Sequence, residues 1–212
     1  MVWWASLLTG AGLGLAGGAA PGPLTALVLT RTLRYGTAEG ARVALAPVIT
    51  DGPLLLGSAL LADRLSDSDV PFAIIGLAGA AFLVALGLES LRASPLDLDA
   101  IEPPRGGVWR AVLTNLLNPH PYIFWVAVGG PLVAEAAHHS AGSVAAFLAG
   151  FFGALCGAKV AMAVLAGRAR PWLTGQAYVW LLRALGLLMW AFAAGFAYES
   201  VTRLYGSATG AA

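Results

Sequence analysis

The feature that most constrains this chain is a series of long apolar runs, two of which contain a charged residue far from either end. These residues are Asp51 and Lys159. An insertion scale places a central Asp or Lys at roughly 2.5–3.5 kcal/mol each, so such residues are normally kept only where they pair or line a wet pathway. We therefore take both as candidate functional residues of a membrane protein.

The composition agrees with this interpretation. Of 212 residues, 58% are hydrophobic and 11% are charged, and the mean hydropathy is +0.78. About 20 apolar residues cross a hydrocarbon layer as a helix, whereas the alternating 10-residue strands of a membrane barrel are absent. We predict an all-α polytopic protein that is one membrane domain over residues 1–212, with six spans at about 3–30, 41–62, 71–91, 108–134, 143–167 and 178–198.

Several function classes are disfavoured. The net charge of +1 gives no electrostatic footprint for nucleic acid. Cys156 is the only cysteine, so no internal disulfide is possible and a packing role is expected. His138 and His139 make a weak metal candidate without further ligands, so no metal or cofactor is expected. No nucleophile, base and orienting group occur together, so we expect no enzyme.

Arginine counts predict the orientation. Because cytoplasmic loops carry the excess of Lys and Arg, both termini are predicted to lie outside. The chain begins without the basic region of a signal peptide, so the first span is predicted to be retained. The first, third and fifth connections hold nine arginines and the opposite side two: Arg31, Arg34, Arg42, Arg92, Arg105, Arg110, Arg168, Arg170 and Arg183 against Arg64 and Arg203.

The two intramembrane charges are predicted to lie at one level. At 1.5 Å per residue, Asp51 is about 15 Å and Lys159 about 12 Å from the cytoplasmic side, so their side chains can meet if both face inward. Snorkelling is the alternative for Lys159, although its side chain leans away from the nearer surface.

Proline-rich motifs predict breaks in the first and fourth spans. Pro21, Gly22 and Pro23 interrupt the first run. Such breaks in transporters expose half-helix ends that hold carboxylates or ions, and they suggest two inverted halves of three helices. The alternative is that the motif forms a kink with a structural role only. The fourth run contains Asn115, Asn118, Pro119, His120 and Pro121.

The polar residues of the fourth span can also have a purely structural role. Asn115 can form an ordinary hydrogen bond between helices, and His120 can either carry a proton or satisfy a polar neighbour.

Residues 12–17 match GxGxxG, but without a preceding strand this is no nucleotide motif. With Gly10 and Gly18, and like the Gly153 and Gly157 pair, these glycines predict close helix packing within the protein or between protomers.

These motifs together resemble the lysine-exporter (LysE/RhtB) family of bacterial amino-acid efflux transporters. The resemblance covers nearly the whole chain. It is carried by Pro21-Gly22-Pro23, by residues 31–36 (Arg-Thr-Leu-Arg-Tyr-Gly), by Gly40 and Asp51, by Leu116-Leu117-Asn118-Pro119, and by the aromatic stretch at 122–125. The chain departs from the family pattern at Ala46-Pro47 and Thr50, where glycines are usual, and at His120, where a lysine is usual.

The resemblance implies a multi-pass exporter in a bacterial cytoplasmic membrane. It implies a small-molecule substrate, an amino acid or related metabolite, moved by an ion gradient or the membrane potential, with homo-oligomers possible. We predict that Asp51 binds a substrate ammonium or a coupling proton, and that Lys159 keeps it charged in alternation with substrate. The half-helix ends at Gly22 and Asn118 are predicted to receive charged groups. Two alternatives remain: an exporter of metal ions or other solutes, and a non-transporting membrane scaffold with a buried structural pair.

Overall fold

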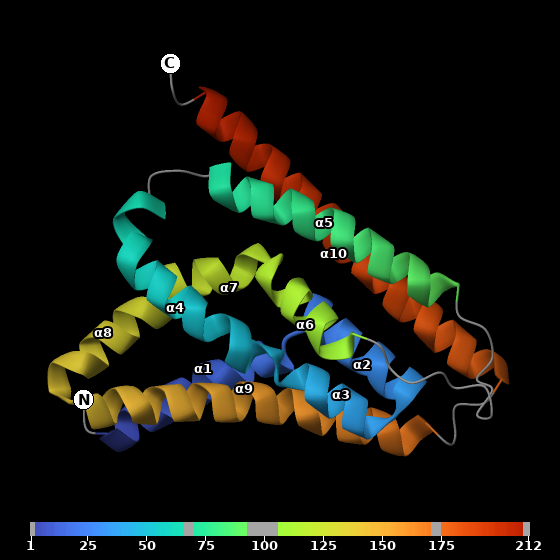
Figure 1. Cartoon of the computed structure of the whole chain (residues 1–212), viewed down its shortest axis with the longest axis horizontal. Helices are drawn as coiled ribbons and strands as arrows, with labels where there is room; N and C mark the ends of the chain where they lie inside the picture. Colours follow the sequence, from blue (N-terminus) through green and yellow to red (C-terminus); the bar gives the residue numbers. More distant parts are fainter. Residues whose placement is uncertain (1–2, 66–69, 93–105, 171–174, 210–212) are drawn as a thin grey trace.

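The computed structural model describes residues 3–65, 70–92, 106–170 and 175–209, and these residues are helical with no strand among them (Figure 1). The elements in chain order are α1 (Trp3–Ala19), α2 (Pro23–Tyr35), α3 (Thr37–Ala44), α4 (Ala46–Leu65), α5 (Val70–Leu91), α6 (Gly107–Leu116), α7 (Pro119–Phe124), the π-helix η1 (Trp125–Gly129), α8 (Gly130–His139), α9 (Ala141–Ala169) and α10 (Gly175–Thr209).

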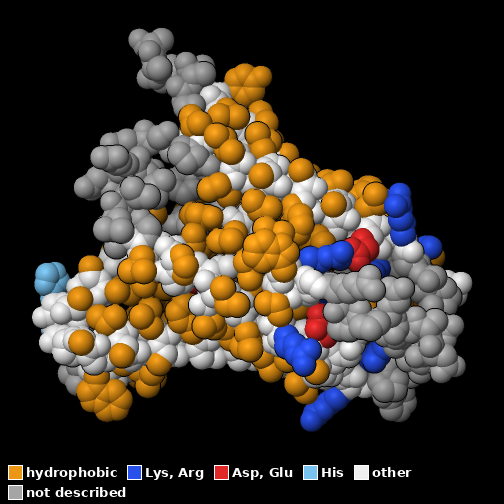
Figure 2. All heavy atoms as spheres, in the orientation of Figure 1, with side chains coloured by type: hydrophobic (Ala, Val, Ile, Leu, Met, Phe, Trp, Pro, Cys, Tyr) orange, Lys and Arg blue, Asp and Glu red, His pale blue; other side chains and the backbone are white. Residues whose placement is uncertain are grey.

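Two long helix pairs frame the molecule. α1 packs along α9, and α5 packs along α10 (Figure 1). The short helices α2, α3, α6 and α7 lie between these pairs, and α2 contacts both α9 and α10. The surface seen in Figure 2 is largely apolar, and large side chains such as Trp180 and Leu165 are mostly exposed. An apolar exterior of this kind suits lipid as the surrounding solvent.

Small residues allow α1 to approach α9 closely. Gly10, Gly14 and Gly18 are buried and spaced by four residues. A Cβ atom on Gly14 would stand 2.1 Å from the carbonyl oxygen of Phe151. These glycines therefore serve packing within the protein, which decides the alternative left open by the sequence. By contrast, a Cβ on Gly153 or Gly157 would meet no atom within 4 Å.

The predicted breaks in the first and fourth runs are confirmed. α1 and α2 are bent by 64° at the Pro21-Gly22-Pro23 motif. Pro23 is the first residue of α2 and Pro119 the first of α7, a position where a missing N–H costs no helical hydrogen bond. Both motifs thus end one helix and begin the next.

The number of predicted spans is only partly supported. Among the described residues, three helices, at Ala73–Leu91, Ala141–Ala169 and Gln176–Tyr205, are long and apolar enough to cross a membrane, and the bent pair α1–α2 could make a fourth. The predicted span at 41–62 is interrupted at Leu45, because Pro47 cannot continue a helix from α3 but fits the first turn of α4. The predicted span at 108–134 is divided into α6, α7, η1 and α8. Six spans and two inverted halves therefore stay predictions.

The glycine packing of α1 leads to a stability prediction. Gly14→Ala should lower the free energy of unfolding by about 1–3 kcal/mol, because the added methyl group collides with the backbone of α9. Gly12→Ala is the matched control, since a Cβ there meets nothing within 4 Å. Thermal unfolding of both variants in detergent checks this, and equal melting temperatures would contradict the packing account.

Candidate functional site

A cavity of about 470 Å³ lies where the two broken helices meet α4, α9 and α10. This volume falls within the roughly 300–1,000 Å³ of small-molecule sites. Most of the predicted site residues line it, namely Pro21, Gly22, Pro23, Asp51, Asn115, Asn118, His120, Pro121 and Lys159. Pro119 does not line it and is buried at the start of α7.

The Asp51 side chain, on α4, forms hydrogen bonds with a neighbouring residue of α4 and with a residue of α6. Asp51 is 5% exposed. Asn115 Nδ2 donates to Asp51 Oδ1 at 2.7 Å and to Thr50 Oγ1 at 2.6 Å, and Thr50 Oγ1 lies 3.0 Å from the same carboxylate oxygen. These contacts use Oδ1 of the carboxylate, and both Asp51 and Asn115 line the cavity.

Trp125 is a further neighbour of Asp51. Its side chain is fully buried and interacts with the Asp51 carboxylate. The indole Nε1 nevertheless meets the geometry of a hydrogen bond to no atom in the part of the chain that the structure describes. A small shift of either side chain would supply Asp51 with one more donor.

Lys159 reaches across from α9 to the break between α1 and α2. Its side chain is 5% exposed, and Nζ donates to Thr25 Oγ1 at 2.9 Å and to the Gly18 carbonyl oxygen at 3.3 Å. Thr25 Oγ1 in turn donates to the carbonyl oxygen of Ala20 at 3.1 Å. The end of α1 carries unpaired carbonyl groups that favour a cation. Lys159 therefore does not snorkel to the surface.

Asp51 and Lys159 do not pair directly. Within the described residues each has its own hydrogen-bond partners, Thr50 and Asn115 for the carboxylate and Thr25 and Gly18 for the ammonium. The sequence left direct pairing of these side chains open, and in the structure the break between α1 and α2 supplies the acceptors that Lys159 uses. Both nevertheless face one cavity.

The α6–α7 break contributes Asn118 and His120. Asn118 Oδ1 accepts a hydrogen bond from the His120 backbone N–H at 3.0 Å and so caps α7. The exposed His120 ring packs edge-on against Phe196, with 5.5 Å between ring centroids. The remaining cavity wall is largely apolar, and Phe124 and Phe151 stack there with centroids 5.2 Å apart.

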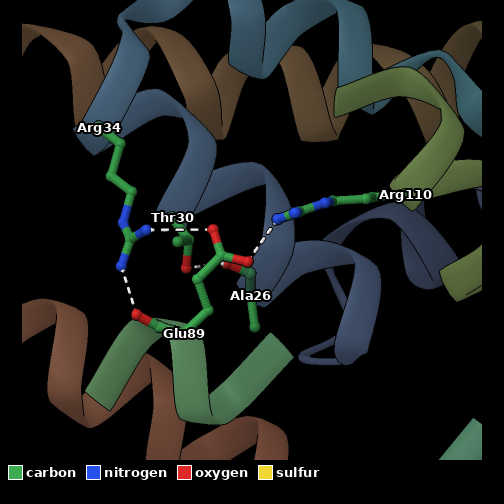
Figure 3. Close-up of polar contacts among 5 residues, drawn as sticks. All are labelled: Ala26, Thr30, Arg34, Glu89 and Arg110. Carbon is green, nitrogen blue, oxygen red and sulfur yellow. Dashed lines mark hydrogen bonds and ion pairs between the residues drawn. The ribbon is translucent and has the colours of Figure 1, made fainter. Parts of the chain in front are cut away.

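One ion-pair cluster was not identified from the sequence. Glu89 on α5 accepts from Arg34 Nη1 on α2 at 3.3 Å and pairs through its other oxygen with Arg110 on α6 (Figure 3). Arg34 Nη2 also donates to the Glu89 carbonyl oxygen at 2.7 Å. The sequence feature that could have indicated this cluster is the position of Glu89 near the end of an apolar run. The cluster ties three helices together.

No group of three or more His, Cys, Asp or Glu residues that could hold a metal ion occurs among the described side chains. Thr25 and Trp125 were also missed as site neighbours, because a threonine or tryptophan within an apolar run carries no distinctive signal.

A family model for LysE type translocators matches residues 15–200. The chain belongs to the LysE translocator family. Comparison with curated proteins and with solved structures gave no match. Family membership and the apolar helices make this LysE translocator a multi-pass membrane exporter of small solutes.

The contact between Thr25 and Lys159 leads to a prediction. In a double-mutant cycle, Thr25→Val and Lys159→Met should show an interaction energy of about 0.5–3 kcal/mol in unfolding, as is typical of residues in contact. Thr30→Val is the control, because the Thr30 hydroxyl also donates to a backbone carbonyl oxygen, that of Ala26, whereas Lys159 donates to Thr25. Additive effects for Thr25 and Lys159 in detergent unfolding would contradict the geometry.

Proposed function

We propose that this LysE translocator exports amino acids or related small metabolites from a bacterial cytoplasm, driven by an ion gradient or the membrane potential. One observation carries the proposal: two buried opposite charges face the same cavity at the junction of two broken helices. An amino acid presents the two complementary charges within one small molecule. Discontinuous helices around a central site are the arrangement that secondary transporters use for such solutes.

The charged groups have distinct proposed roles. Asp51 binds the substrate ammonium or a coupling proton through the oxygen that the Asn115 contact leaves free. Lys159 stabilises the carboxylate form of Asp51 when substrate is absent, because both lie in one poorly hydrated cavity. Substrate and coupling ion can then alternate at the same place.

Two other functions receive less support. A metal exporter needs clustered soft or acidic ligands along its path, and the described residues of the cavity lining include one carboxylate and one histidine. A scaffold protein would keep the charges only as a structural pair, but each has neutral partners and no direct contact with the other.

The proposed orientation places both termini outside the cytoplasm. The Lys and Arg side chains visible in Figure 2 gather at one end of the molecule, where α2, α5 and α9 end and α10 begins in Figure 1. This clustering supports the assignment of that end to the cytoplasm. Reporter fusions at Gly210 and between residues 94 and 104 should label opposite sides, with the latter cytoplasmic. A cytoplasmic signal from Gly210 would overturn the orientation.

We expect Asp51→Asn to abolish transport while leaving a folded, inserted protein. Asn keeps the volume and can still accept from Asn115, but it carries no charge to bind an ammonium or a proton. Transport by the reconstituted variant, measured across pH together with its melting temperature, tests this. Gly52→Ala is a neighbouring control, since its Cβ meets no atom within 4 Å. Parent-like flux in Asp51→Asn would rule out the coupling role.

The Glu89 cluster is proposed to keep the arginine-rich end of the cavity closed. It joins α2 and α6, which both contribute cavity residues, to α5, which contributes none of those lining the cavity. Opening toward that end therefore requires the cluster to separate. Glu89→Gln should raise transport or leak severalfold while costing about 1 kcal/mol or less in stability, because the pairs are partly exposed. Glu199→Gln is the control, since Glu199 pairs with Arg203 on its own helix and so joins no separate helices through this contact. Unchanged flux in Glu89→Gln would contradict the closure role.

A further inference from the structure

The charged groups of the cavity are balanced, and this balance constrains the substrate. Of the described residues that line it, Asp51 is the one carboxylate and Lys159 the one ammonium. The rest are mainly aliphatic and aromatic, with Phe124, Phe151 and Phe192 among them. A third charge on a bound molecule would find no further Asp, Glu, Lys or Arg side chain among the described residues of these walls.

The Lys159 end is arranged to hold an anion. An ammonium has three protons, and two of them are used by Thr25 and Gly18, which leaves one for a ligand. The same wall includes Gly22, Pro23 and Leu24 at the start of α2, a helix of 13 residues. The first N–H groups of that helix lack helical acceptors and carry the positive end of its dipole.

The Asp51 end is arranged to hold a cation. The hydrogen bonds from Thr50 and Asn115 use Asp51 Oδ1, and the Asn115 amide donates through Nδ2, so neither contact occupies Asp51 Oδ2 or the Asn115 carbonyl oxygen. Both residues line the cavity. The anionic and cationic ends are thus supplied by different helices, α4 and α6 at one end and α2 and α9 at the other.

We propose that the cavity selects a zwitterionic amino acid whose side chain is uncharged. Its carboxylate binds Lys159 and the start of α2, its ammonium binds Asp51 and Asn115, and its side chain lies against Phe124 and Phe151. This inference rests on the proposed export of amino acids. It adds that the substrate side chain is uncharged and that the substrate is oriented with its carboxylate toward Lys159 and its ammonium toward Asp51. A basic or acidic amino acid would bring an unpaired charge against the aromatic wall and bind more weakly.

Matched analogues of one ligand test this. L-Norleucine has an apolar chain, and L-lysine adds a terminal ammonium to a chain of the same length. Norleucinamide lacks the carboxylate charge, and hexanoate lacks the ammonium. Calorimetric binding to the purified full chain in detergent should rank norleucine first, with the other three, and L-glutamate, at least about tenfold weaker.

Variants of Lys159 and Asp51 test the proposed orientation of the bound amino acid in the cavity. Lys159→Met should bind norleucine and norleucinamide equally while it still discriminates against hexanoate. Asp51→Asn should bind norleucine and hexanoate equally while it still prefers norleucine over its amide. A purely structural role for either residue would weaken all ligands alike and would overturn the pose. Thr25→Val, which removes the hydroxyl that positions Lys159, should narrow the preference for norleucine over its amide, and this variant serves if Lys159→Met does not fold.

The outcomes separate this inference from the proposed function. L-Lysine or L-glutamate binding as tightly as norleucine would overturn the charge selection and leave amino-acid export standing. Failure of the reconstituted parent to bind or move any of these amino acids would overturn both.

Discussion

The structure depends on keeping two opposite charges apart inside an apolar protein. A buried carboxylate and a buried ammonium attract each other strongly where water is scarce. Here each is occupied by neutral groups of the chain, Asp51 by Asn115 and Thr50, and Lys159 by Thr25 and the end of α1. Both side chains line one cavity, where we propose that they bind a ligand.

The broken helices make this separation possible. Lys159 finds acceptors because the Pro21-Gly22-Pro23 motif ends α1 beside it and leaves carbonyl groups without helical donors. Asn115 reaches Asp51 from the last turn of α6, shortly before the Asn118-Pro119 break turns the chain into α7. Close packing of α1 on α9 through Gly14 and Gly18 then sets the distance from Lys159 to the break. Continuous helices would offer no such polar groups at this level.

The sequence predicted the parts of this arrangement that follow from single residues. Charges in apolar runs and prolines in mid-run identified Asp51, Lys159 and both breaks, because lipid makes such residues costly unless they serve a purpose. The partners were not predictable, since Thr25 and Glu89 acquire their roles only when separate helices come together. The same limit explains why the sequence left direct contact between Asp51 and Lys159 open: it indicates the depth of each residue along its helix but not the rotation of the helix about its axis.

Accessibility of the cavity tests the central claim most directly. A Cys156→Ala background removes the single native cysteine, and Ala20→Cys then places one thiol on the cavity wall. A charged, membrane-impermeant thiol reagent should label this position in reconstituted protein, norleucine should slow the labelling, and Leu165→Cys on the exposed apolar surface should not respond to norleucine. Absence of labelling at Ala20→Cys, or labelling that no transported amino acid slows, would show that the solute does not pass between Asp51 and Lys159.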